Sequence, residues 1–422
     1  MNNKVERILI YLVLAGNFLA QGLYFPSFNY LPIYLIFLII LGIFELVNWF
    51  SSHHGKLYLR CCNGIPLIVI LIYLNVVLVY LVNFIFDFKA LTLILFTMLF
   101  GLACFNTINN EADLFKLLNV FVCLVVFSSL VEIGQFFEIP FCRLLWTVTH
   151  ISDRLDQAIA EGRYIGMASD AVQFGYQCTA AIAILLFSNY NRKFSGVRII
   201  ALIIISFALL TNNTRSAQIC MALLLCIWLF SDKSIVKNKT FRVILGAIVI
   251  CIFCIYIPNS ELFKNSRFIT GAESAGTKAR IPMILTAFNH AFYYPFGMGE
   301  YIVNPSLVIG IDNTTLWSVV HNGAHNILGN CVASFGFLGL FLMILLYYKI
   351  YKLYTDYRCI KSVSLLYMAS FYAIVVLFIN SFFHNSYILN GDFSSWFFIG
   401  VLLSKSKLIN LLSEEESSEK SK

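Results

Sequence analysis

Three arginines and a histidine stand where apolar runs of the chain begin or end. Arg163 precedes one such run, Arg215 lies in a short turn between two runs, and Arg280 begins a helical segment of the largest loop. His325 opens the run that continues to Tyr348. A guanidinium group stays charged at any working pH, and its planar fork of donors matches a diphosphate. Histidine titrates near neutrality and can take a proton from a hydroxyl. These residues indicate a membrane enzyme with a cationic pocket for an anionic lipid substrate.

Each of these residues also has a simpler interpretation. An arginine at a membrane edge can extend to water or hold lipid headgroups. We favour ligand binding for Arg215, because desolvation is costly in a tight turn between apolar helices. Asn326, next to His325, and His321 are candidate supporting residues. The spacing of His321 and His325 would suit a zinc site on a helix, but no Asp or Glu lies in the neighbouring turns. We therefore expect no metal.

The composition is that of a membrane protein. Of the 422 residues, 59% are hydrophobic and 12% are charged, with a mean hydropathy of +0.81. A soluble domain has about 25% charged residues. Since one membrane crossing takes about 20 apolar residues, the sequence predicts an all-α integral membrane protein with about twelve spans and a helical cap of outer loops. The predicted runs are 7–25, 31–50, 64–86, 90–105, 115–137, 165–188, 197–211, 216–230, 243–258, 326–348, 363–383 and 393–404.

The distribution of basic residues predicts the orientation. Cytoplasmic loops of membrane proteins retain Lys and Arg. With both ends of the chain in the cytoplasm, 20 of the 29 basic residues lie inside and nine lie outside. The three candidate arginines belong to the outer nine, so the candidate site is expected on the outer face.

The loops divide the chain into segments. We expect an interfacial helix in the first long outer loop, where Leu144, Val148, Leu155 and Ile159 follow helical spacing. A second helix is expected from Ala279 to Tyr293 in the larger outer loop. The predicted segments are 1–137 with spans one to five, 138–164 with the interfacial helix, 165–258 with spans six to nine and the Arg215 turn, 259–325 as the large outer loop, 326–404 with spans ten to twelve, and 405–422 as a disordered cytoplasmic tail.

From Arg163 to Tyr348 the chain resembles the O-antigen polymerase and O-antigen ligase family of polytopic membrane glycosyltransferases. The resemblance rests on Gly162-Arg163-Tyr164-Ile165-Gly166, on Thr214-Arg215-Ser216-Ala217, on Ala279-Arg280 with Tyr294-Pro295-Phe296-Gly297-Met298-Gly299, and on Ala324-His325-Asn326-Ile327-Leu328 with Phe335-Gly336-Phe337-Leu338-Gly339-Leu340. It implies that Arg163, Arg215 and Arg280 bind a lipid diphosphate and that His325 acts on the acceptor. Many relatives also carry a Glu after the His-Asn pair, where this chain has Cys331-Val332-Ala333-Ser334. That role would pass to another acid, such as Glu273, Glu300 or Asp312.

The resemblance implies a polymerase that joins undecaprenyl-diphosphate-linked oligosaccharide repeats of an O-antigen or capsule, at the outer face of a bacterial cytoplasmic membrane. A ligase that transfers glycan to lipid A-core would use the same donor. A flippase would also use cations in the membrane, and it should show repeat symmetry between its halves. Here the charged positions cluster at one face, and the second half holds nearly all of them. The diphosphate leaving group carries its own activation, so we expect no cofactor. Expected partners are the lipid-linked donor, the bilayer, a chain-length regulator and a flippase, and not nucleic acid. The remaining histidines are weaker candidates, among them His384, which shares a short outer loop with Asp392.

Overall fold

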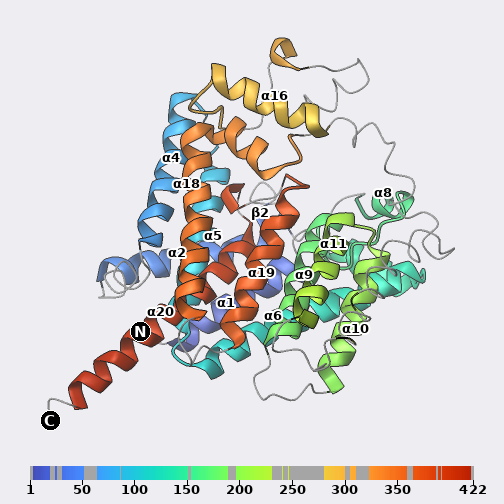
Figure 1. Ribbon diagram of the computed structural model, residues 1–422. Coiled ribbons are helices and arrows are strands. Elements are labelled where there is room, and N and C mark those ends of the chain that lie inside the picture. The colour runs from blue at the N-terminus through green and yellow to red at the C-terminus, as the bar shows by residue number, and fades with distance from the viewer. Residues whose placement is uncertain are drawn as a thin grey trace.

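The computed structural model describes residues 3–19, 24–25, 31–51, 64–85, 87–150, 154–188, 196–230, 240, 246, 280–299, 305–309, 323–358, 365–385, 388–390 and 392–419. These residues form a bundle of helices (Figure 1). The helices that make up the bundle are α1 (Asn3–Leu19), α2 (Ile33–Ser51), α4 (Ile65–Val82), α5 (Phe88–Thr107), α6 (Glu111–Phe136), α9 (Ala171–Phe187), α10 (Gly196–Thr211), α11 (Arg215–Phe230), α18 (Ile327–Arg358), α19 (Leu365–Ser381) and α20 (Phe393–Glu419).

Shorter elements lie in the connections between these helices. Two-residue strands β1 (Tyr24–Phe25) and β2 (Leu31–Pro32) pair antiparallel after α1. The remaining elements are helices α7 (Pro140–Thr149), α8 (Arg154–Ala160) and α16 (Arg280–Tyr293), and the 3₁₀ turns η4 (Pro305–Leu307) and η5 (Ile388–Asn390).

The lengths of the helices support an all-helical membrane protein. Within the described ranges, α2, α4, α5, α6 and α18 are the five helices long and apolar enough to cross a membrane. The apolar helices α9, α10, α11 and α19 have 16 or 17 residues. At 1.5 Å per residue such a helix rises about 25 Å, less than the roughly 30 Å of a hydrocarbon core. The count of twelve spans is therefore not established, and nearly all of the run 243–258 lies outside the described residues.

Helix α9 is the centre of the part of the bundle that carries the Arg215 turn. Fifteen of its 17 residues are buried, because α19, α11, α10 and α6 pack around it. Gly175 allows α11 to approach closely: a Cβ built there would lie 2.9 Å from the Cβ of Ala217, in the first turn of α11. The start of α11 is therefore held directly against α9.

Helix α18 is interrupted at Gly336, where φ is 69° and ψ is −173°. The segment after α16 lies against this break: the backbone nitrogens of Met298 and Gly299 donate to the carbonyls of Ala333 and Ser334 at 3.0 and 2.8 Å, and Phe337 N donates to Pro295 O at 3.1 Å. Irregular backbone is tolerated within a membrane protein where other groups satisfy it in this way. In Figure 1, α16 (yellow) lies across the end of α18 that carries this segment.

Two predictions about the loops and the tail need correction. The sequence predicts one interfacial helix in the first outer loop, but this loop forms α7 and α8, because His150 leaves the helical conformation at φ −134°. Consequently Val148 is 65% exposed while Leu155 is buried. The predicted helix 279–293 is present as α16. At the other end, α20 continues to Glu419, whereas the sequence predicts disorder from residue 405.

A buried lysine explains why α20 continues past residue 405. Lys407 donates to the carbonyl of Asn106 at 2.8 Å and to the side-chain oxygen of Asn109 at 2.8 Å. These groups lie at the C-terminal end of α5, where carbonyls are left without helical partners and attract positive charge.

Candidate functional site

The Arg215 turn is fixed by side-chain hydrogen bonds to the residues on both sides of Arg163. Asn212 donates to the carbonyl of Tyr164 at 2.5 Å, and Asn213, which has a φ of 64°, donates to that of Gly162 at 3.2 Å. Thr214 Oγ1 donates to the carbonyl of Ala171 at 3.0 Å. All three side chains are buried, whereas Arg215, the first residue of α11, is partly exposed. The predicted tight turn is therefore present, and its arginine reaches the surface of the site.

Arg163 lies beside this turn. One of its guanidinium nitrogens is 3.4 Å from Thr214 Oγ1, and another is 3.8 Å from the Glu161 carboxylate. The segment that follows is held by Gln135 of α6, whose side chain accepts from the backbone nitrogens of Ile165 and Gly166. Two of the three predicted arginines are thus brought together at the C-terminal end of α6.

His325 lies in a turn immediately before α18. Its backbone has a φ of 46°, in the left-handed region that non-glycine residues seldom adopt. Asn326 caps the helix, since its side-chain oxygen accepts from the backbone nitrogens of Leu328 and Gly329 at 2.9 and 3.3 Å. Asn326 therefore supports the start of the helix that follows His325.

Arg280 approaches His325 from α16. Small residues allow this: Ala287 and Ala291 of α16 pack against Ala324, Val332 and Ala333 around the start of α18. Burial lowers the pKa of His325 from its ordinary value of 6.5, and the positive charge of Arg280 lowers it further. Both effects favour the neutral form of the imidazole.

The turn after α19 joins the two halves of the site. His384 Nε2 is 3.0 Å from Ser216 Oγ, next to Arg215, and Asn385 Oδ1 accepts from the backbone nitrogen of His325 at 2.8 Å. Through these contacts the structure gathers Arg163, Arg215, Arg280 and His325 at one end of the bundle.

Comparison with known families bears on this arrangement. Residues 200–344 match the family model described as O-antigen ligase. This part of the chain is similar to that family. Family members are glycosyltransferase-like enzymes of O-antigen and glycan transfer, and the resemblance seen in the sequence is confirmed. No curated protein matches the chain.

The O-antigen ligase segment holds Arg215, Arg280 and His325 but not the whole site. Arg163 precedes it, and His384 and Asn385 follow it. The sequence interpretation ranks His384 low and does not include Asn385. A signal is nevertheless present, because the dipeptide His-Asn occurs at 384–385 as it does at 321–322 and 325–326, and the copies at 325–326 and 384–385 lie at the ends of apolar runs.

Four predicted site residues lie outside the described part of the chain. They are His321 and the acids Glu273, Glu300 and Asp312. Asp392, the acid that shares a loop with His384, caps α20 by accepting from the backbone nitrogens of Ser394 and Ser395 and from the Ser395 hydroxyl. Among the described residues, no three of the types His, Cys, Asp and Glu are grouped so as to hold a metal.

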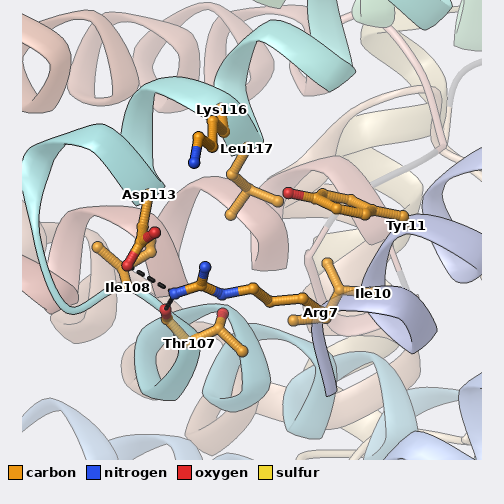
Figure 2. Close-up of a pocket in the computed structure, with 8 residues that line it drawn as sticks. All are labelled: Arg7, Ile10, Tyr11, Thr107, Ile108, Asp113, Lys116 and Leu117. Atoms are coloured by element: carbon orange, nitrogen blue, oxygen red, sulfur yellow. Dashed lines mark hydrogen bonds and ion pairs between the residues drawn. The ribbon is translucent and has the colours of Figure 1, made fainter. Parts of the chain in front are cut away.

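A small pocket at the other end of α6 lies far from this site. It is lined by Arg7 and Tyr11 of α1, by Thr107, and by Asp113 and Lys116 of α6 (Figure 2). Arg7, one of the lining residues, donates to Asp113 at 2.6 Å and to the Thr107 carbonyl at 3.2 Å. About 30 Å of helix separates Asp113 from the Arg163 region, at 1.5 Å per residue. This ion pair fastens α1 to α6 rather than forming part of the candidate site.

Proposed function

We propose that the protein is a polysaccharide polymerase that joins undecaprenyl-diphosphate-linked oligosaccharide repeats of an O-antigen or capsule at the outer face of the bacterial cytoplasmic membrane. The single observation that carries this proposal is the contact of one turn, after α19, with both the Arg215 turn and the His325 turn. It brings cations suited to a diphosphate next to a neutral base. The family match supports the same class of reaction.

The proposed reaction is a displacement at the anomeric carbon of the donor sugar. His325 takes the proton of an acceptor hydroxyl, the hydroxyl oxygen forms a bond to the anomeric carbon, and the bond from that carbon to the diphosphate oxygen breaks. The lipid diphosphate leaves with the electron pair, and Arg163, Arg215 and Arg280 stabilise its charge. The leaving group supplies the activation, so neither a nucleotide nor a metal is needed, and chelators should leave the rate unchanged.

A ligase that transfers the glycan to lipid A-core is the second candidate, and the description of the matching family model favours it. Ligase and polymerase use the same donor and leaving group, so the same residues would serve both. They differ in the acceptor.

Deletion of the gene and electrophoresis of the surface polysaccharide test the proposal. Loss of the polymerase leaves core carrying single repeat units, whereas loss of a ligase leaves core without glycan while long lipid-linked chains accumulate. Loss of a flippase would instead trap the donor on the cytoplasmic side. The polymerase proposal is overturned if the deletion strain still makes full-length glycan on its lipid carrier.

A further inference from the structure

The turn that follows α19 has its own structural features. Phe382, the first residue after the helix end at Ser381, accepts a hydrogen bond from the Asn326 side chain at its carbonyl, at 3.0 Å. With the contacts of His384 and Asn385 described above, three of the four residues 382–385 bind to the Arg215 turn or to the His325 turn. The segment thus has one contact surface toward the arginines and another toward the base.

Asn385 controls the backbone at His325. Its side-chain oxygen accepts two hydrogen bonds, from His325 N at 2.8 Å and from Asn330 Nδ2 at 2.9 Å. A left-handed non-glycine residue such as His325 keeps its conformation only where the surroundings hold it. Gly323 leaves the space for this contact, because a Cβ there would lie 2.9 Å from the Asn385 oxygen. The Asn385 oxygen therefore helps to fix the direction of the His325 side chain.

His384 controls the first turn of α11. Its Nε2 is hydrogen-bonded to the hydroxyl of Ser216, which is only 4% exposed and directly follows Arg215. The imidazole is also packed edge-on against the ring of Tyr176 from α9, with centroids 6.0 Å apart and an interplanar angle of 62°. His384 therefore ties the helix end that carries Arg215 to the central helix of the bundle.

We propose that Asn385 and His384 are positioning residues of the transfer site, Asn385 orienting His325 for proton removal and His384 orienting Arg215 for the diphosphate. This inference rests on the proposed function. Because the two residues act on different parts of the reaction, their loss should have different kinetic effects. Loss of the Asn385 acceptor should lower kcat, and loss of the His384 contact should raise the KM of the donor.

The test uses the full-length protein in nanodiscs with a synthetic undecaprenyl-diphosphate-linked repeat unit as the varied substrate. Asn385→Leu removes the acceptor at similar size and should lower kcat about tenfold or more, with KM within about twofold, because general-base assistance contributes about 10²–10⁴-fold. Asn385→Asp keeps an acceptor oxygen and should keep kcat within about threefold. His384→Leu should raise the donor KM about tenfold, and His384→Gln, which retains a polar atom at similar reach, should restore most of the affinity.

Phe383→Ala is the matched control, since Phe383 lies in the same turn with its side chain exposed, and it should leave both constants unchanged. A second measurement is independent of activity. Hydrogen exchange of the peptide 323–328 should be faster in Asn385→Leu than in the parent and in Asn385→Asp. If Asn385→Leu does not fold, Asn385→Ala removes the same acceptor and gives the same comparison.

The outcomes separate this inference from the proposed function. An active parent whose Asn385→Leu variant keeps its kcat and its slow exchange overturns the role of Asn385. An unchanged donor KM in His384→Leu overturns the role of His384. A parent that transfers no sugar from the lipid-linked unit to any acceptor overturns the proposed function instead, and the exchange measurement still decides whether Asn385 holds the His325 turn.

Discussion

Gly297 and Gly336 cross with their backbones in direct contact. A Cβ built on Gly297 would lie 2.5 Å from the backbone nitrogen of Gly336, and one built on Gly336 would lie 2.2 Å from the carbonyl oxygen of Pro295. Asn75 of α4 and Asn83, the residue that follows this helix, bind the same crossing and donate to the carbonyls of Phe335 and Gly297 at 3.2 and 3.1 Å. The two glycine-containing motifs of the sequence are therefore halves of one joint, which fixes the segment after α16 to α18.

Gly336→Ala should strongly destabilise the protein. The substitution places a Cβ against backbone atoms, which cannot move aside as the end of a side chain can. The loss should exceed the roughly 1–3 kcal/mol expected from an unfavourable backbone conformation alone. Gly64→Ala is the control, because Gly64 also has a positive φ, of 79°, but a Cβ added there would have no neighbouring atom within 4 Å. Thermal unfolding in detergent should give a much larger fall in Tm for Gly336→Ala than for Gly64→Ala. Equal falls would contradict the close backbone contact between Gly297 and Gly336.

The sequence predicts the helices better than it predicts the site. Apolar runs determine where helices form, so the turn at Arg215 and the helix 280–293 follow from hydropathy and spacing alone. Asn385 cannot be found in this way. Its importance comes from an acceptor atom placed 2.8 Å from a residue 60 positions earlier in the chain, and no local pattern encodes that distance.

The two wrong predictions, for the first outer loop and for the C-terminal tail, also result from contacts that no local sequence pattern encodes. The prediction of a single helix in the first outer loop is wrong. Trp146 stacks on His150 where α7 ends, with ring centroids 4.5 Å apart, and the spacing of apolar residues gives no sign of this contact. The prediction of a disordered tail is wrong because a charged segment is expected to be exposed to solvent. Lys407 instead forms hydrogen bonds at the end of α5, which is distant in the sequence.

Arg215→Lys should strongly reduce transfer while expression and Tm stay at parental values. Lysine keeps the charge but loses the planar fork that binds two phosphate oxygens at once. Arg280→Lys should behave similarly. Arg163→Lys should reduce transfer less, because the Arg163 guanidinium is also 3.8 Å from the Glu161 carboxylate and so divides its interactions between that group and the substrate. Initial rates with the lipid-linked donor provide the measurement, and a near-normal rate in Arg215→Lys would show that the residue only anchors its turn.

Thr211→Val should be more harmful to stability than Glu132→Gln. Glu132 is fully buried in α6 and accepts from the Thr211 hydroxyl at 2.8 and 3.0 Å. Valine leaves this carboxyl group buried without its donor, which costs about 1–3 kcal/mol. Glutamine retains an acceptor oxygen for the threonine and should lose less than about 1 kcal/mol. Thermal unfolding of the two variants makes the comparison, and a larger loss in Glu132→Gln would contradict it.

Labelling of single cysteines in intact cells should report the orientation. The excess of basic residues on one side predicts that cysteines at Gln157 and Ser274 react with an impermeant maleimide, and that those at Lys237 and Glu415 react only after lysis. Gln157 lies on an exposed face of α8, so a lack of reaction there cannot be attributed to burial. Labelling of Lys237→Cys in intact cells would reverse the orientation and with it the side on which the site opens.

The pH dependence of transfer should reveal both His325 and its cationic neighbour. Proton removal needs the neutral imidazole, and burial together with the charge of Arg280 holds the pKa of His325 below 6.5. The rate should therefore stay constant as the pH falls toward 6.5 and decline only at more acidic pH. His325→Ala should lower kcat by about 10²–10⁴-fold, and the decline of the rate at acidic pH, the acidic limb of the profile, should disappear.

Arg280→Gln isolates the electrostatic contribution. It removes the positive charge that disfavours protonation, so the acidic limb should move up toward pH 6.5, whereas Arg280→Lys should leave it in place. The profile is measured as log kcat against pH with saturating donor, so that weaker binding of the diphosphate does not distort it. A limb that keeps its position in Arg280→Gln would mean that Arg280 does not act on the base, and a limb that persists in His325→Ala would assign the titrating group elsewhere.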